Sequence, residues 1–170
     1  MCIRDRLVLA VGRLHPQKGY DVLLAALPEV GDAVVAVAGD GPLEAELRAQ
    51  APHVRWLGRR DDVADLYAAA DVVVLPSQWE ARSLTAQEAL RAGRPLVATA
   101  VGGLPALLRD GAVLVPPGDP VALGRAVRRL LDDPDEAAAV AARGRAVAAT
   151  WPDEQDAVAQ VAALYAELLG

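Results

Sequence analysis

Short apolar runs rich in valine and leucine alternate with segments of helical periodicity along most of this sequence. The run Val72-Val73-Val74-Leu75 is apolar at consecutive positions, so both of its faces are expected to be buried in the centre of a sheet. Strands that alternate with helices are typical of parallel sheets. The chain is therefore predicted to be an α/β protein, with a Rossmann-like parallel sheet of about six strands, helices on both faces and a helical C-terminal tail.

The boundaries of these elements follow from the turn residues between them. The predicted strands cover residues 7–11, 33–38, 54–57, 71–75, 95–99 and 112–115. The predicted helices cover residues 19–30, 42–50, 63–70, 85–92, 104–109, 120–131, 135–150 and 153–168. Asp40-Gly41-Pro42 predicts a turn with Pro42 at the first helical position. The last three helices follow one another without a strand and form the tail.

Size and charge restrict the class of protein. A chain of 170 residues, 54% of them hydrophobic, can bury about two-thirds of its unfolded surface around one core, so residues 7–170 are treated as one domain. A net charge of −6 argues against nucleic acid as a partner, because phosphate-backbone binding requires a clustered basic face. The sequence holds no apolar stretch suited to crossing a membrane. The single cysteine, Cys2, cannot form an internal disulfide, and we expect a cytoplasmic protein.

The first six residues carry charges but no helix cap, and they lead directly into the first predicted strand. We interpret residues 1–6 as a non-native scar of sequence assembly or cloning and exclude them from the fold prediction. On this interpretation the natural protein begins further upstream.

A loop with two cations follows the first predicted strand. Gly12 allows a ligand to approach the backbone, while Arg13 and Lys18 precede a helix whose free N-terminal amides favour anions. This combination suits a diphosphate, although the loop is neither a dinucleotide-binding fingerprint nor a Walker loop. The alternative is that both cations are ordinary solvated surface residues.

Two carboxylates follow the central strand. Glu80 lies in the loop after Leu75, at the edge where open α/β sheets bind ligands, and Glu88 follows eight residues later on a predicted helix. Thr85 and Glu88 also match a capping box, in which Glu88 would only satisfy a backbone amide. A glycosidase pair is less consistent with the pattern, since the spacing does not place both carboxylates across one bond.

Glycine-rich turns and an acidic segment occur elsewhere in the sequence. Gly39-Asp40-Gly41 and Gly102-Gly103 each lie after a strand and before a helix, on the same edge of the sheet as Glu80. The acidic segment at residues 132–135 separates two helices, which favours helix capping over metal binding. No metal site is predicted.

Taken in order, these segments resemble the retaining glycosyltransferases of family 4, and specifically the C-terminal, donor-binding domain of their GT-B fold. The matching residues are Gly12-Arg13, Lys18-Gly19, Gly39-Asp40-Gly41-Pro42, Ala70-Asp71, Leu75-Pro76-Ser77, Glu80, Glu88-Ala89, Gly93 to Thr99 and Gly102 to Pro105. The resemblance implies transfer of a sugar from a nucleotide donor, such as a UDP- or GDP-sugar, with retention at the anomeric carbon. It implies no other cofactor.

The resemblance also implies roles for individual residues. Arg13 and Lys18 would hold the diphosphate and stabilise its leaving charge. Glu80 would orient the hexose hydroxyls, and Glu88 would bind the ribose. Backbone groups near Arg59 would meet the base. Close backbone approach and the phosphate cradle would involve Gly12, Ala81, Arg82, Ser83, Leu84, Gly102 and Gly103.

Two positions depart from the family pattern. Ala81-Arg82-Ser83 stands where Gly-aromatic-Gly is usual, and Ala106 stands where a glutamate is usual. Donor identity is therefore left open, and Arg82 is expected either to contact phosphate or to project into solvent.

The remaining alternatives are a sugar-nucleotide epimerase and a non-catalytic nucleotide-sugar-binding module. The spacing of Glu80 and Glu88 favours transfer over epimerisation. The resemblance implies that the acceptor site lies on an N-terminal domain missing from this chain, so the chain by itself is expected to be inactive. Any peripheral contact with a membrane would be made by that missing half.

Overall fold

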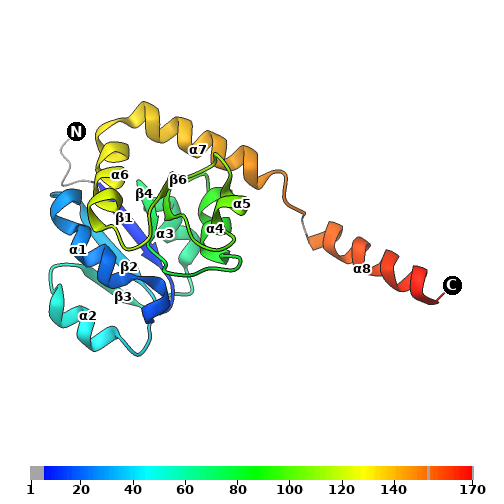
Figure 1. The fold of residues 1–170 in the computed structure, drawn as a ribbon, viewed down its shortest axis with the longest axis horizontal. Helices are drawn as coiled ribbons and strands as arrows, with labels where there is room; N and C mark the ends of the chain where they lie inside the picture. The colour runs from blue at the N-terminus through cyan, green and yellow to red at the C-terminus, as the bar shows by residue number, and fades with distance from the viewer. Residues whose placement is uncertain (1–5, 153, 170) are drawn as a thin grey trace.

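The computed structural model describes the backbone of residues 6–152 and 154–169, and their side chains except those of residues 154–157, 160 and 169. A parallel sheet of six strands forms its centre, in the order β3-β2-β1-β4-β5-β6 (Figure 1). The strands are β1 (Leu7–Val11), β2 (Val34–Ala38), β3 (Arg55–Gly58), β4 (Val72–Leu75), β5 (Leu96–Thr99) and β6 (Val113–Val115). This sheet confirms the predicted α/β, Rossmann-like class.

The order of the strands reverses between β1 and β4. β1 pairs with β2 on one side, where Leu7 lies opposite Val34. It pairs with β4 on the other side, where Val8 lies opposite Val72. The connections leaving β1 and β4 therefore run in opposite directions across the sheet, and in open α/β sheets the carboxyl edge at such a reversal is where ligands commonly bind.

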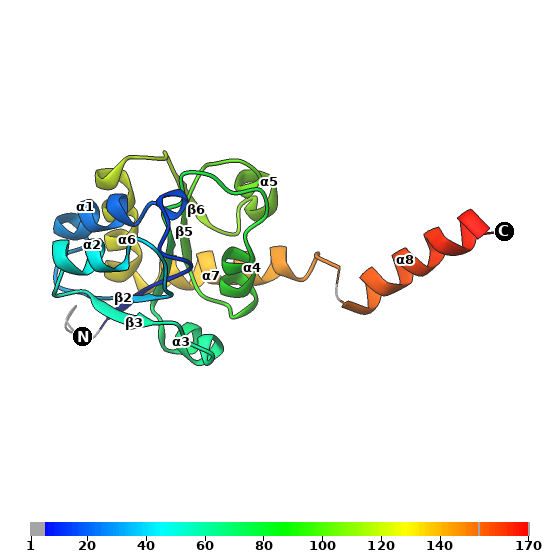
Figure 2. The same ribbon diagram turned by 90° about the horizontal axis from the view of Figure 1, so that it is seen from below.

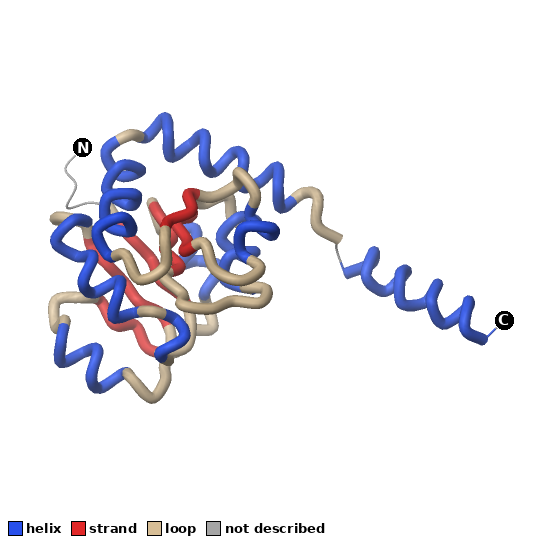
Figure 3. The backbone as a smooth tube through the Cα atoms, in the orientation of Figure 1, coloured by secondary structure: helices blue, strands red, loops and turns tan. Residues whose placement is uncertain are grey.

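Helices cover both faces of the sheet (Figure 3). They are α1 (Tyr20–Val30), α2 (Glu44–Gln50), α3 (Val63–Ala69), α4 (Leu84–Arg91), α5 (Leu104–Leu108), α6 (Pro120–Asp132) and α7 (Pro134–Ala148). A further helix, α8 (Glu154–Leu169), follows α7 along the chain. A short 3-10 helix, η2 (Pro16–Lys18), lies between β1 and α1 and was not predicted.

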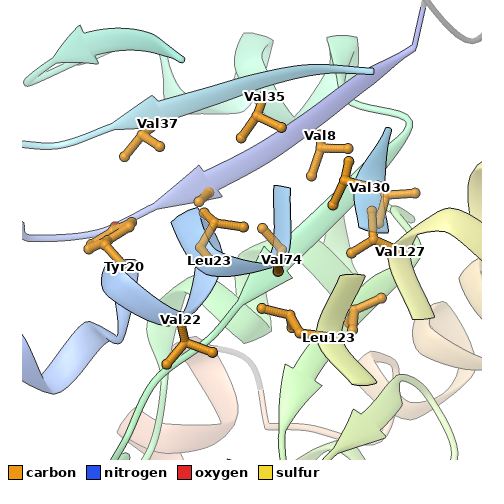
Figure 4. Packing of buried hydrophobic residues seen from close by; sticks show 14 of the residues in the cluster. Val8, Tyr20, Val22, Leu23, Val30, Val35, Val37, Val74, Leu123 and Val127 are labelled. Carbon is orange, nitrogen blue, oxygen red and sulfur yellow. The ribbon is translucent and has the colours of Figure 1, made fainter. Parts of the chain in front are cut away.

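Side chains of consecutive strand residues point to opposite faces, so the sheet divides the apolar core into two clusters. On one face Val8 and Val74 pack with Leu23 of α1 and Leu123 of α6, all fully buried (Figure 4). On the other face Leu9 and the neighbouring strand residues pack against α3, α4 and α5. The strand residues of β4 are buried on both faces, as the unbroken apolar run predicts.

Polar caps fix several helix starts. Asp119 accepts a hydrogen bond from the Ala122 amide at the start of α6, and Asp133 accepts bonds from the Asp135 and Glu136 amides at the start of α7. These bonds confirm the capping interpretation of the acidic segment. The predicted start at Pro42 was wrong, because residues 42 and 43 form a turn and α2 begins at Glu44.

The two ends of the described chain differ in their contacts. Arg6, which we interpreted with residues 1–5 as a non-native scar, forms an ion pair of 2.7 Å with Asp71, so it belongs to the folded structure. Residues 1–5 lie outside the described part. Helix α8 projects away from the sheet and its covering helices (Figure 2). Its apolar side chains are exposed, among them Val158, Leu164 and Leu168.

Candidate functional site

The candidate site lies at the reversal of strand order, where the loops that follow β1 and β4 meet. These loops touch closely, since the Gln78 amide donates a hydrogen bond of 2.8 Å to the Gln17 carbonyl. The Gln17 side chain donates to the carbonyl of Trp79 at 3.0 Å. A Cβ atom on Gly19 would lie 2.1 Å from the Pro76 carbonyl oxygen, so no larger residue fits there. The η2 turn and glycine therefore lock the β1 loop against the β4 loop.

Lys18 and Glu80 form an ion pair between these two loops. The ammonium of Lys18 lies 2.5 Å from Oε1 of Glu80, and the two side chains are only 20% and 6% exposed. Ser77 donates a hydrogen bond of 2.8 Å to the same carboxylate oxygen. A buried carboxylate requires a cation and hydrogen-bond donors, and Glu80 has both. Its second oxygen, Oε2, receives no hydrogen bond from the described residues.

The loop after β5 supports Glu80 from behind. The Gly103 amide donates to the Glu80 carbonyl at 2.9 Å. A Cβ atom on Gly102 would lie 2.0 Å from that carbonyl oxygen, and one on Gly103 would lie 2.0 Å from the Ala81 carbonyl oxygen. Gly102 also has φ +50°, in the left-handed region. Both predicted glycines therefore shape the site by allowing two loops to touch.

Glu88 lies on α4 and is held from α3. The hydroxyl of Tyr67 donates a hydrogen bond of 3.0 Å to Oε2 of Glu88. The N-cap of α4 is Ser83, whose hydroxyl accepts from the Ala86 amide at 3.2 Å. The capping box between Thr85 and Glu88 is therefore excluded, because Thr85 already lies inside the helix and Glu88 bonds to another element.

Arg59 and Gly12 line one small hollow at the ends of β1, β2 and β3, together with Val11, Ala38, Gly39, Arg60 and Val63. Tyr20 donates a hydrogen bond of 2.9 Å to the Gly12 carbonyl and fixes this end of β1. Arg13, Ala81, Arg82 and Leu84 are exposed around the same edge. The structure thus brings the predicted site residues to one edge of the sheet.

Burial and neighbouring carboxylates raise the pKa values of two tyrosines at the site. Desolvation, reinforced by the charge of Glu80, raises the pKa of Tyr20 well above its ordinary value. Desolvation also raises the pKa of Tyr67, with the charge and hydrogen bond of Glu88 adding to the shift. Both phenols therefore remain neutral hydrogen-bond donors at physiological pH.

Sequence reasoning missed the residues that hold the two glutamates. Ser77 and Tyr67 were not identified as site residues, and the pairing of Lys18 with Glu80 was not anticipated. For Ser77 the available signal was its position, a polar residue three places before Glu80 and directly after a buried strand. For Tyr67 there was none, because its contact with Glu88 joins residues 21 apart in sequence.

Two further features concern what lies outside this edge. A larger hollow, lined mainly by apolar residues of α1, β2 and the loop after α2, lies at the opposite edge and contains none of the predicted site residues. Within residues 6–152 and 154–169, no cluster of three or more His, Cys, Asp or Glu side chains is arranged to hold a metal ion. In the same residues, no helix has both the length and the apolar character needed to cross a membrane.

Comparison with known proteins identifies relatives of this arrangement. A D-inositol 3-phosphate glycosyltransferase of Mycobacterium sp. (strain KMS) is 40% identical over 122 residues, which cover 64% of this chain and 28% of the relative. The enzyme of the same name from Thermobispora bispora is 34% identical over an alignment covering 96% of this chain and 44% of the relative.

Solved structures show the same fold. The Anabaena protein HepE, in complex with UDP, superposes with a TM-score of 0.88 at 27% identity, over 96% of this chain and 49% of that protein. A sucrose-phosphate synthase from Thermosynechococcus elongatus superposes with a TM-score of 0.87 at 31% identity, over 99% of this chain and 47% of that protein. This chain therefore spans less than half the length of these relatives. The model of the family described as glycosyl transferases group 1 matches residues 5–133, and this chain belongs to that family.

Proposed function

We propose that this chain is the donor-binding part of a retaining glycosyltransferase, which transfers a hexose from a nucleotide sugar to an acceptor. The observation that carries this proposal is the Lys18–Glu80 ion pair between the loops that follow β1 and β4. A cation suits the diphosphate of a donor, and a carboxylate suits the sugar hydroxyls. Their contact at 2.5 Å brings the two groups together, which supports the proposal that both bind one nucleotide sugar.

The diphosphate would bind beside the ammonium of Lys18. The ammonium can make several hydrogen bonds, so it can keep Glu80 and contact phosphate at once. Arg13 is exposed on the same loop and can turn to the second phosphate. The free amides at the start of α4, near residues 81–84, add the positive end of a helix dipole. We propose that these groups neutralise the diphosphate without a divalent metal.

The remaining parts of the donor would lie on either side of the diphosphate. Glu88 would accept hydrogen bonds from the ribose hydroxyls, and the base would lie near Arg59 in the hollow beside Gly12. Glu80 would receive the sugar hydroxyls on its second oxygen. In the transition state, Lys18 and Arg13 would stabilise the negative charge that develops on the departing diphosphate.

The acceptor and the rest of the catalytic machinery are proposed to lie on a separate N-terminal domain. HepE structures with UDP-glucose and with UDP plus glucose are among those similar to this chain, which supports a nucleotide sugar as the ligand. The single cysteine agrees with a reducing compartment, and we propose that the reaction takes place in the cytoplasm.

Calorimetry on the chain tests this proposal. UDP, GDP, UDP-glucose and GDP-mannose would be titrated in buffer containing a metal chelator. At least one nucleotide is expected to bind, and Glu88→Gln should weaken binding of the nucleotide and its sugar derivative alike. Glu80→Gln should spare the nucleotide and weaken only the sugar derivative. Failure of all four compounds to bind, or of both variants to change binding, would overturn the proposal.

A further inference from the structure

Each of the two glutamates in the site is held through a single carboxylate oxygen. Glu80 uses Oε1 for both Lys18 and Ser77. Glu88 uses Oε2 for Tyr67. In the described residues no hydrogen bond reaches the other oxygen of either side chain. Each carboxylate is thus oriented by the protein and keeps one oxygen available to a ligand.

Ser77 is itself fixed by its surroundings. Its side chain is fully buried directly after β4. Thr99, at the end of β5, donates a hydrogen bond of 2.5 Å to the Ser77 carbonyl. The hydroxyl of Ser77 can therefore hold Glu80 in one orientation even if Lys18 turns toward a phosphate.

Tyr67 plays the corresponding part for Glu88. Tyr67 is 3% exposed and belongs to α3, whereas Glu88 is exposed on α4. Its hydroxyl lies 3.0 Å from Glu88 Oε2 and 3.4 Å from the Thr85 carbonyl. An exposed glutamate otherwise samples several rotamers, and binding would have to restrict them. The neutral phenol donates to the carboxylate and reduces that cost.

We propose that Ser77 and Tyr67 are positioning residues that prepare two separate parts of the donor site, Ser77 for the transferred sugar and Tyr67 for the nucleotide. This inference rests on the proposed function and adds a prediction that the function does not contain. The two hydroxyls act through different glutamates, so their loss should affect different parts of the same ligand.

Two variants that remove only a hydroxyl make the test. Ser77→Ala and Tyr67→Phe would be titrated with whichever nucleotide and matching nucleotide sugar bind the wild type. Tyr67→Phe is expected to weaken both compounds by the same factor, about 3- to 10-fold. Ser77→Ala is expected to leave the nucleotide unchanged and weaken the nucleotide sugar by a similar factor. Each variant serves as the control for the other, and Tyr165→Phe removes an exposed phenol from α8.

The ratio of the affinities for the nucleotide and for the nucleotide sugar distinguishes a positioning role from a general loss of structure. A purely structural role would lower the melting temperature and weaken both compounds in both variants, which would overturn the inference. If Ser77→Ala fails to fold, Ser77→Cys keeps the side-chain geometry with a slightly larger atom and a weaker donor, and it should show the same selective loss. Wild-type binding by both variants, alongside losses in Glu80→Gln and Glu88→Gln, would overturn the inference and leave the proposed function standing. Unchanged binding in all four would overturn both.

Discussion

Two cations with different surroundings define the proposed phosphate site. Arg13 is exposed, whereas Lys18 is paired with a buried carboxylate. Replacing both by alanine is expected to weaken binding of UDP or GDP by about 2–4 kcal/mol, because a hydrogen bond to a charged group contributes about 1.5–3 kcal/mol and exposure reduces this value. Calorimetry measures the loss, with Arg55→Ala as a control at the opposite end of the strands. Unchanged affinity in the double variant would contradict the phosphate assignment.

Lys18→Ala alone carries a second effect, since it leaves Glu80 buried without its cation. We expect the free energy of unfolding to fall by about 1–3 kcal/mol, the usual cost of an unsatisfied buried polar group. Urea denaturation would detect this change. Combining Lys18→Ala with Glu80→Gln should recover part of it, because the variant side chain is neutral. No recovery in the double variant would show that the loss does not come from the unpaired charge of Glu80.

The two buried tyrosines make stability sensitive to alkaline pH. Their pKa values are raised above the ordinary 10.0, and unfolding returns them to that value. The stabilisation is fully present below about pH 10 and is lost as pH rises, because the unfolded chain then releases protons that the folded chain retains. For each tyrosine, the free energy of unfolding should fall by up to about 1.4 kcal/mol per pH unit.

Denaturation between about pH 9 and 11 tests this linkage. Tyr67→Phe should reduce the slope of the free energy of unfolding against pH by the contribution of one tyrosine. Tyr165→Phe is the matched control for loss of an exposed phenol. The same slope in wild type and Tyr67→Phe would contradict the raised pKa of Tyr67.

At the scale of an element, the contact between the β1 and β4 loops depends on Gly19. Gly19 and Gly118 have nearly the same backbone, with φ of +65° and +69°, but a Cβ on Gly118 would meet nothing within 4 Å. Gly118→Ala should therefore cost about 1–2 kcal/mol for the left-handed backbone alone. Gly19→Ala should cost more, because its Cβ would lie 2.1 Å from a backbone carbonyl. Equal melting temperatures for the two variants would contradict this close contact.

Much of the fold could be predicted at this scale, because strand and helix periodicities are local properties of the sequence. All six strands were located within one or two residues, and the apolar run of β4 correctly indicated a central strand. The η2 turn was missed, since its three residues lack a periodicity of their own. The predicted start at Pro42 failed because a proline favours both helix starts and turns.

The site could be predicted only in part for a related reason. Gly12, Lys18 and Glu80 could be assigned to one edge of the sheet, because carboxyl ends of parallel strands share that edge. The partners within the site could not, since hydrogen bonds such as that from Tyr67 to Glu88 depend on how separate helices pack. The sequence therefore indicated which edge of the sheet holds the candidate binding residues, and the structure shows which of these residues are in contact.

At the scale of the whole molecule, every side chain of α8 that the structure describes is exposed. Val158, Val161, Leu164, Tyr165 and Leu168 are at least half exposed. Few buried contacts imply easy local opening, so hydrogen exchange should be faster across α8 than across the buried strand β4. Exchange measured by mass spectrometry on α8 and β4 peptides checks this expectation. Equal protection of the two elements would show that α8 is covered in solution.

The proposal that the donor and the acceptor bind to separate domains also concerns the whole molecule. The chain spans less than half of its solved relatives, and we expect it to bind a nucleotide sugar without transferring the sugar. Fusion to the N-terminal domain of a similar glycosyltransferase should create transfer activity and slow exchange in α8. A radiolabelled donor assay on the isolated chain and the fusion makes the comparison. Turnover onto an acceptor by the isolated chain would contradict the proposal.

Lys18 is the only lysine in the sequence, and its side chain is paired with Glu80 at 20% exposure. Apart from the chain terminus, the proposed phosphate site therefore holds the one primary amine available to acylating reagents. Chemical labelling would mark this site without any engineered tag. A lysine-specific protease would have a single peptide bond to cut, the one before Gly19, where the chain is pressed against Pro76. Cleavage there would thus report directly on separation of the two loops.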